Sequence, residues 1–275
     1  MKALKKLGAG LAALMAMSAG NAHAGLAQWS SNNIEYLYGT HYNQIGADGH
    51  DTRSIVTIEH VDAWKYGDNF FFVDITNADR QGKLGSNGSG GEFATYYGEL
   101  SPRLSFGKIT GKDLSFGIFK DFLFTATLEM PTATVVQLGG ATNNLLLQNE
   151  QTYLYGLATD LKLPGFAYFQ VNLYRRDNQS SAVGAGGQLT LVWGAPFSIG
   201  PAKMMFEGFF DYAFSESGLH DNIITAPRLL VDAGDFFGAP GTVQVGCEWQ
   251  IWRNQFGIKD ENESVPQAMV KVIFN

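Results

Sequence analysis

Residues 242–254 read TVQVGCEWQIWRN, and apolar and polar side chains alternate along this stretch. Its apolar face is formed by Val243, Val245, Cys247, Trp249 and Ile251, and its polar face by Gln244, Gly246, Glu248, Gln250 and Trp252. A period of two residues indicates a β-strand, because successive side chains of a strand point to opposite faces of the sheet. A strand that crosses an outer membrane has about 9–11 residues, apolar toward lipid and polar toward the lumen. The stretch therefore predicts a membrane-spanning strand.

Three further segments, 167–176, 204–214 and 266–274, alternate in the same way. The strands of a soluble sandwich would also alternate, so the period alone fits two classes of protein. Two details favour the membrane. The apolar faces end in aromatic residues, as lipid-facing girdles do, and the polar faces hold single acids and bases in mid-strand, as a hydrated lumen allows.

Composition narrows the class further. Of the 275 residues, 45% are hydrophobic and 16% are charged, and the abundant aromatic residues exclude a disordered chain. The single cysteine, Cys247, excludes an internal disulfide framework and a thiolate zinc cluster. Apolar runs beyond the N-terminal segment are short pieces such as 70–72 and 145–147, whereas a spanning helix needs about 18 residues. If the chain enters a membrane, it does so as a barrel.

About a dozen segments have the character of strands, and an even number brings both termini of a barrel to one side of the membrane. They lie near 32–42, 52–64, 67–77, 92–106, 113–129, 150–162, 166–177, 187–195, 202–215, 226–237, 242–255 and 265–274. The short connections 107–112 and 163–165 indicate periplasmic turns. Long outside loops are expected at 78–91, 130–149, 178–186, 216–224 and 256–264. The sequence thus predicts an all-β fold, a single transmembrane antiparallel β-barrel of about 12 strands.

The N-terminal segment is expected to lie outside this fold. A basic start, MKALKK (1–6), precedes a short apolar stretch over 7–17, and AHA (22–24) forms an A-x-A cleavage site. These features are typical of a secretory signal peptide. We therefore expect residues 1–24 to be cleaved and residues 25–275 to form the barrel. Loss of the lysines at the start leaves acids well in excess of bases, so nucleic acid is not an expected partner.

Several blocks of the sequence carry a family resemblance. The blocks are GELSPRLSF (98–106), KITGKDLSFGIFKDF (108–122), YGLATDL (155–161), VNLY (171–174), GCEWQIWRNQFGI (246–258) and VPQAMVK (265–271). The first four resemble the Tsx family of nucleoside-specific outer-membrane channels, and the last two resemble its OmpK branch. The resemblance covers most of residues 32–274 and is densest around 113–117.

The resemblance implies a twelve-stranded monomeric barrel in the outer membrane of a Gram-negative bacterium. Such a barrel passes nucleosides, contacts outer-membrane lipid and can serve as a phage receptor through its outer loops. The barrel-assembly machinery would read its C-terminal strand. These barrels usually end on an aromatic residue, whereas here Phe274 is followed by Asn275.

A nucleoside presents a flat base and a ribose with hydroxyl groups. A selective lumen would stack the base on aromatic rings and bind the hydroxyls with carboxylates or amides. The strand phases put five aromatic residues on polar faces, Phe72, Tyr168, Tyr174, Phe209 and Trp252. The polar residues that the same phases put beside them are Glu59, Asp74, Glu99, Arg103, Asp160, Asn172, Arg176, Glu207, Asp211, Asp232, Glu248 and Lys271. Alternatively, these charges pair across a hydrated lumen and hold the barrel in shape, and the aromatic rings fill a narrow barrel.

Other functions remain open at this point. The chain could be a general small-solute porin, or a structural or adhesion barrel whose outer loops do the work. A barrel phospholipase needs a serine near a histidine base, but none of the mature histidines has a serine two residues on. These histidines are His41, His50, His60 and His220. No phosphate-binding loop, coupling motif or zinc-ligand spacing is present in the sequence, so the expected function is a passive channel without a cofactor or metal.

Overall fold

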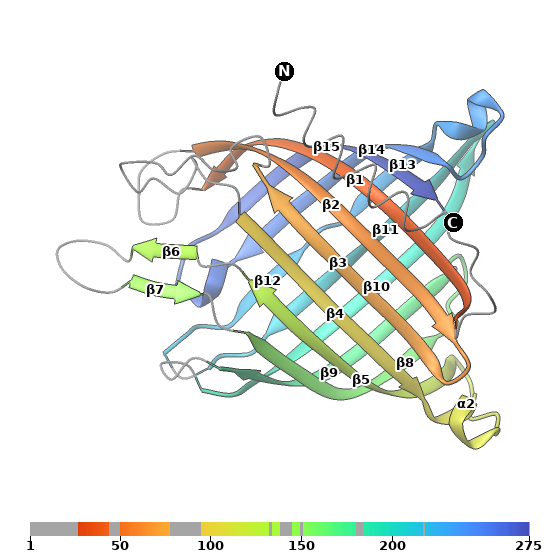
Figure 1. The fold of residues 1–275 in the computed structure, drawn as a ribbon, viewed down its shortest axis with the longest axis horizontal. Coiled ribbons are helices and arrows are strands. Elements are labelled where there is room, and N and C mark those ends of the chain that lie inside the picture. The colour runs from red at the N-terminus through yellow and green to blue at the C-terminus, as the bar shows by residue number, and fades with distance from the viewer. Residues whose placement is uncertain are drawn as a thin grey trace.

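Antiparallel strands of the computed structural model pair in one sheet that closes on itself (Figure 1). The structure describes residues 27–43, 50–77, 95–131, 134–137, 145–148, 151–179, 184–216 and 218–274. The strands of the sheet are β1 (Ala27–Asn43), β2 (His50–Trp64), β3 (Gly67–Thr76), β4 (Thr95–Ser105), β5 (Phe119–Pro131), β8 (Thr152–Leu161), β9 (Tyr168–Asn178), β10 (Gly186–Ile199), β11 (Ala202–Ala213), β12 (Asn222–Thr225), β13 (Arg228–Asp232), β14 (Val243–Arg253) and β15 (Glu263–Phe274).

The ring of pairings is complete. β1 pairs with both β2 and β15, and β10 pairs with both β9 and β11. The short strands β12 and β13 share one position between β11 and β14. The result is the predicted closed antiparallel barrel of twelve strands.

Side chains alternate between the two faces of the barrel wall, as expected for strands. In β15, Gln267 and Lys271 are buried toward the lumen, whereas Val270 is exposed on the outer face. In β14, Glu248 is buried and Trp249 is exposed, which confirms the faces predicted for residues 242–254. A small apolar cluster inside the barrel is formed by Leu37, Leu230 and Met269.

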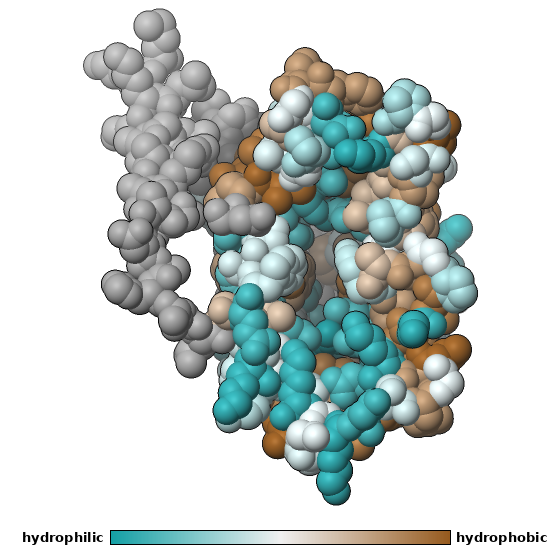
Figure 2. All heavy atoms as spheres, turned by 90° about the vertical axis from the view of Figure 1, so that its right-hand side faces the viewer, coloured by the Kyte–Doolittle hydropathy of each residue, from teal (hydrophilic) through white to brown (hydrophobic). Residues whose placement is uncertain are grey.

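The two ends of the barrel differ in the length of their connections. One end carries the short turns 65–66, 162–167, 200–201 and 233–242 and the helix α2 (Phe106–Thr110). The other carries longer loops and a hairpin of β6 (Thr134–Gln137) and β7 (Leu145–Gln148). Short turns face the periplasm in such barrels, so the end with α2, at the right of Figure 1, is the periplasmic one. Figure 2 looks onto that end and shows a hollow at its centre.

The tenth predicted strand, 226–237, is wrong in extent. The structure has β12 already at Asn222–Thr225, inside the loop expected over 216–224. Pro227 has no N–H to give to the ladder and separates β12 from β13. The neighbouring strand accommodates the break at Gly208, where a Cβ would lie 2.6 Å from the carbonyl oxygen of Ala226.

Two other connections differ from the sequence prediction. The turn expected over 107–112 is longer, because α2 and the following turns extend to residue 118 and β5 begins only at Phe119. The loop expected over 130–149 contains the β6–β7 hairpin. The predicted signal peptide and the loop over 78–91 lie outside the described residues. Within the described part of the chain, no helix is long and apolar enough to cross a membrane.

Candidate channel lumen

All the predicted lumen candidates lie on inner faces of described strands. They are Glu59 on β2, Phe72 and Asp74 on β3, Glu99 and Arg103 on β4, Asp160 on β8, Tyr168, Asn172, Tyr174 and Arg176 on β9, Glu207, Phe209 and Asp211 on β11, Asp232 on β13, Glu248 and Trp252 on β14, and Lys271 on β15. Directly opposed residues share a face of the sheet. One row of opposed residues is Tyr168, Gly194, Glu207, Arg228, Glu248 and Gln267.

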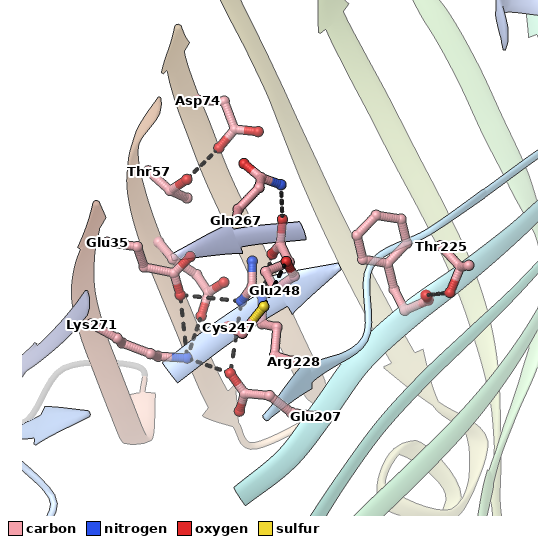
Figure 3. Close-up of polar contacts among 12 residues, drawn as sticks. Glu35, Thr57, Asp74, Glu207, Thr225, Arg228, Cys247, Glu248, Gln267 and Lys271 are labelled. Carbon is pink, nitrogen blue, oxygen red and sulfur yellow. Dashed lines mark hydrogen bonds and ion pairs between the residues drawn. The ribbon is translucent and has the colours of Figure 1, made fainter. Parts of the chain in front are cut away.

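Two cations and four carboxylates meet in the lumen (Figure 3). This Arg228–Lys271 cluster consists of Glu35, Glu59, Glu207, Arg228, Glu248 and Lys271. Arg228 Nε donates to Glu248 Oε2 at 2.6 Å, and Arg228 Nη1 donates to Glu35 Oε1 at 3.2 Å. The arginine therefore ties β13 to its neighbour β14 and to β1, which lies two strands beyond β14 in the ring.

Lys271 joins the same carboxylates from the side of β15. Its Nζ donates to Glu207 Oε1 on β11 at 2.9 Å and lies 3.3 Å from Glu35 Oε1 and 3.9 Å from Glu59 Oε1. Glu35 is the direct cross-strand partner of Lys271 on β1, whereas Glu59 on β2 and Glu207 on β11 belong to strands that do not pair with β15. To meet these two carboxylates, the side chains must extend over the intervening strands inside the lumen. The cations of the cluster are thus held by carboxylates, and the carboxylates are in excess.

Amides and hydroxyls continue the cluster toward the extracellular side. Gln267 Nε2 donates to Glu248 Oε1 at 2.9 Å, and Tyr42 Oη donates to Gln267 Oε1 at 2.5 Å. Several buried oxygens nearby have no hydrogen-bond partner in the described structure, namely Asn33 Oδ1, Glu35 Oε2 and Gln244 Oε1. These oxygens have almost no accessible surface, so they add negative potential to the lumen but offer a solute no direct contact.

A second group of charges lies around Arg176. Its guanidinium binds both oxygens of Glu129 on β5, with Nη2 to Oε2 at 2.7 Å, and Nη1 donates to Gln188 Oε1 at 2.9 Å. Glu99 accepts from Tyr97 Oη at 2.6 Å. A bidentate pair of this kind fixes the arginine in one orientation, and it braces β9 against β5 across the intervening β8.

A third group lies at the periplasmic end. Arg103 Nε and Nη2 donate to the two oxygens of Asp68 at 2.7 and 2.8 Å, and Nη1 donates to Asp160 Oδ1 at 2.8 Å. Ser105 Oγ donates to Asp121 Oδ2 at 2.5 Å. Two of the predicted candidates, Arg103 and Asp160, are thus partners of each other.

The tyrosines on the inner face differ in what they can offer a solute. Tyr174 is buried, and its Oη lies 2.9 Å from Thr125 Oγ1, so its ring is packed into the wall. Tyr168 is 41% exposed, although it also faces the lumen. It lies over Gly194, where an added Cβ would come within 2.3 Å of the ring. The missing side chain at Gly194 therefore gives the Tyr168 ring room to pack against the wall, while part of the residue stays exposed.

The other three aromatic candidates have ring or strand partners. The ring centroids of Trp252 and Phe256 lie 4.6 Å apart, and Trp252 Nε1 donates to Asn222 Oδ1 at 3.3 Å. The ring centroids of Phe72 and Tyr97 lie 5.8 Å apart. Phe209 is half-buried, and its carbonyl oxygen accepts from Thr225 Oγ1 at 2.6 Å.

Several residues that build these groups were not among the site residues expected from the sequence. They are Glu35, Tyr42, Tyr97, Glu129, Gln267 and Arg228. A signal existed for Glu129, because Thr125, Thr127 and Glu129 alternate with apolar residues. For Arg228 no such signal was available, since the interrupted strand hides its period.

One acid at the extracellular rim belongs to the loop after β11. Glu216 Oε1 lies 3.5 Å from Arg176 Nε, and the Glu216 side chain is covered. Burial raises the pKa of Glu216, and the positive charge of Arg176 opposes this shift. No group of acidic, histidine or cysteine side chains within the described residues could hold a metal ion.

Comparisons with known proteins agree with this architecture. Residues 25–227 match the family described as nucleoside-specific channel-forming protein, Tsx. The outer membrane protein OmpK of Vibrio parahaemolyticus is 26% identical over 197 residues, which cover 71% of this chain and 67% of OmpK. OmpK of Vibrio parahaemolyticus serotype O3:K6 is 26% identical over 166 residues, which cover 60% of this chain and 58% of that protein.

Solved barrels are more distant. The KdgM porin, solved in complex with disordered oligogalacturonate, is 9% identical, with a TM-score of 0.46 over 88% of this chain and 99% of KdgM. OprB of Pseudomonas putida is 8% identical, with a TM-score of 0.40 over 90% of this chain and 94% of OprB.

Proposed function

This chain belongs to the Tsx family of outer-membrane channel proteins, and we propose that its lumen selects nucleosides. This family consists of channels and not of enzymes, which excludes the phospholipase alternative. The proposed transport is passive, because a lumen that binds a solute weakly at several sites can conduct it down its gradient.

The charges of the lumen support a neutral solute. Acidic side chains outnumber basic ones on the inner faces, and Arg103, Arg176 and Arg228 are each held by at least one carboxylate. A solute carrying phosphate would meet this excess of negative charge in a confined space, where screening is weak. Ribose hydroxyls and base amino groups, in contrast, are neutral donors and can form hydrogen bonds with partly exposed carboxylates of the inner face such as those of Asp68 and Asp160. The lumen thus favours nucleosides over nucleotides.

The single observation that carries the proposal is the position of Tyr168. Tyr168 is partly exposed, and it shares a register row with Glu207, separated from it only by Gly194. A base stacked on the Tyr168 ring would place its ribose near the carboxylates of the Arg228–Lys271 cluster. Stacking of a base on an aromatic side chain contributes about 1–3 kcal/mol, which holds a solute and still lets it leave.

The test is the block of ionic current by adenosine in a planar bilayer. Tyr168→Ala should weaken the block by roughly 5- to 150-fold, which corresponds to the loss of about 1–3 kcal/mol. Tyr153→Ala is the matched control, since Tyr153 is 42% exposed but lies on the outer face of β8. Equal block in wild type and Tyr168→Ala, with folding verified by the heat-induced gel shift, would remove Tyr168 from the site. A large conductance insensitive to adenosine would instead indicate a general porin.

We also propose roles for the parts of the chain that surround the channel. The loops at the extracellular end are the surface that a phage would bind, and the band of exposed apolar side chains on the outer face contacts outer-membrane lipid. The assembly machinery would bind β15, whose outer face carries Val270, Val272 and Phe274. Residues 1–24 would direct export and be cleaved.

A further inference from the structure

The connection between β4 and β5 projects from the periplasmic end of the barrel (Figure 1). It starts with α2, whose first turn is capped by Ser105 Oγ accepting from the Lys108 N–H at 2.9 Å. Gly111 then ends the helix with φ at 68°, in the left-handed region that glycine adopts without strain. This connection contains residues 113–117, the densest part of the family resemblance, yet it takes no part in the lumen.

The apolar side of this connection continues the lipid-facing surface of the barrel. Phe116, Phe119 and Phe122 form a stack with ring centroids 5.0–5.8 Å apart. Phe122 lies on the outer face of β5, because the next residue, Leu123, is buried in the lumen. Phe116 is 62% exposed, and Ile118 is exposed as well. An apolar surface of this kind is unfavourable in water and typical of the membrane interface.

Lysines surround the same connection. Lys108, Lys112 and Lys120 line a pocket of about 300 Å³. Lys162 adjoins it, since its backbone N–H donates to the Ile118 carbonyl oxygen at 2.7 Å. Figure 2 shows hydrophilic side chains projecting at the lower edge of this end, where Figure 1 places α2.

The two acids of the pocket are engaged in local hydrogen bonds. Asp113 Oδ1 accepts from the Ser115 N–H at 2.9 Å, and Asp121 accepts from Ser105 Oγ and from the Phe122 N–H. Among the described residues, none of the four lysines forms an ion pair, and Lys108 Nζ donates to the Gly67 carbonyl oxygen at 3.2 Å. The connection therefore presents positive charge that its own acids do not neutralise.

We propose that this basic foot, defined as residues 106–120 together with Lys162, binds the phosphate headgroup of an anionic phospholipid in the inner leaflet. The stacked phenylalanines lie among the acyl chains, and the lysines meet the phosphate at the level of the headgroups. Basic residues near a membrane surface attract anionic lipids in this way, and apolar side chains add binding energy from the same interface. A free phosphate ion would use the lysines only, whereas a lipid uses both halves of the foot.

The experiment is native mass spectrometry of the whole barrel in detergent, titrated with phosphatidylglycerol or with phosphatidylcholine. The wild type should retain phosphatidylglycerol in preference to phosphatidylcholine. Lys112→Gln and Lys120→Gln should each weaken phosphatidylglycerol binding about fivefold, the effect of one basic residue at a membrane surface. Lys203→Gln is the matched control, because Lys203 is exposed at a different periplasmic turn and pairs with Asp235. It should leave lipid retention unchanged.

Three results would overturn the proposal. Equal retention of phosphatidylglycerol in the wild type and in the Lys112→Gln, Lys120→Gln double variant would exclude the lysines. Retention of both lipids alike would exclude charge recognition. Displacement of phosphatidylglycerol by millimolar inorganic phosphate, together with no effect of Phe116→Ala, would mean that the pocket binds phosphate and not a lipid. Adenosine block should be the same in the double variant as in the wild type, so this test does not depend on the proposed nucleoside selectivity.

Discussion

Replacing Lys271 by glutamine should strongly destabilise the barrel. Lys271 Nζ contacts Glu207 Oε1 at 2.9 Å and lies near Glu35 and Glu59, so its loss leaves the four carboxylates of the Arg228–Lys271 cluster with Arg228 as the remaining cation. Removing one partner of a buried ion pair costs about 3–5 kcal/mol, because the other charge stays buried without compensation. Water in the lumen will solvate part of that charge, so the lower end of this range is expected.

Lys203→Gln provides a control with nearly the same geometry. Lys203 Nζ contacts Asp235 Oδ1 at 2.7 Å, but its side chain is 58% exposed, whereas that of Lys271 is 8% exposed. Exposed pairs contribute little to stability, so Lys203→Gln should behave like the wild type. The comparison separates burial from contact distance as the source of the effect.

The assay is equilibrium unfolding in urea from lipid vesicles, followed by tryptophan fluorescence. The expected result is a lower midpoint for Lys271→Gln with an unchanged slope, and a wild-type midpoint for Lys203→Gln. If the two variants shift the midpoint equally, the cluster does not hold the barrel together, and its charges act only on solutes that pass.

Three more predictions concern the wall and the rim. Trp249→Arg, near the middle of the outer face of β14, should lower the free energy of unfolding from the membrane by about 2–4 kcal/mol and hinder insertion into vesicles. Gln250→Arg should insert normally and change conductance. The reverse pattern would mean that the lipid-facing and lumen-facing residues of β14 are assigned one residue out of step. Tyr174→Phe removes the hydrogen bond with Thr125 and should lower the unfolding free energy by about 1 kcal/mol without changing adenosine block, and a changed block would show that this tyrosine touches the solute. Burial raises the pKa of Glu216, so the wild type loses stability as pH rises through that pKa; Glu216→Gln should raise the melting temperature at pH 8 more than at pH 5, and an equal shift at both would contradict the burial argument.

The barrel and its faces could be predicted from the sequence because a membrane wall imposes a strict period. In β14 every second residue must suit lipid, so Val245, Cys247 and Trp249 alternate with polar residues in the sequence itself. The prediction from this period fails at two places. At Pro227 the strand breaks, and over residues 113–118 the sequence still alternates although these residues lie outside the sheet.

The contacts of the site could not be predicted in the same way. The period assigns a residue to the inner face, but the partner across the lumen depends on barrel diameter and register. Glu207 was placed correctly on the inner face, yet its partner Lys271 lies 64 residues away on a strand that does not pair with β11. For the same reason the sequence did not distinguish the packed Tyr174 from the partly exposed Tyr168.

The most direct test of the proposed function is the wild-type channel in a planar bilayer, with adenosine or adenosine 5′-monophosphate added at equal concentration. Both solutes carry the same base, so either can stack on Tyr168. They differ in charge, because only the monophosphate brings a negatively charged group into the acidic lumen. The account predicts a small conductance that adenosine blocks in a saturable manner, with much weaker block by the monophosphate. Equal block by both solutes, or a large conductance that neither solute changes, would contradict it.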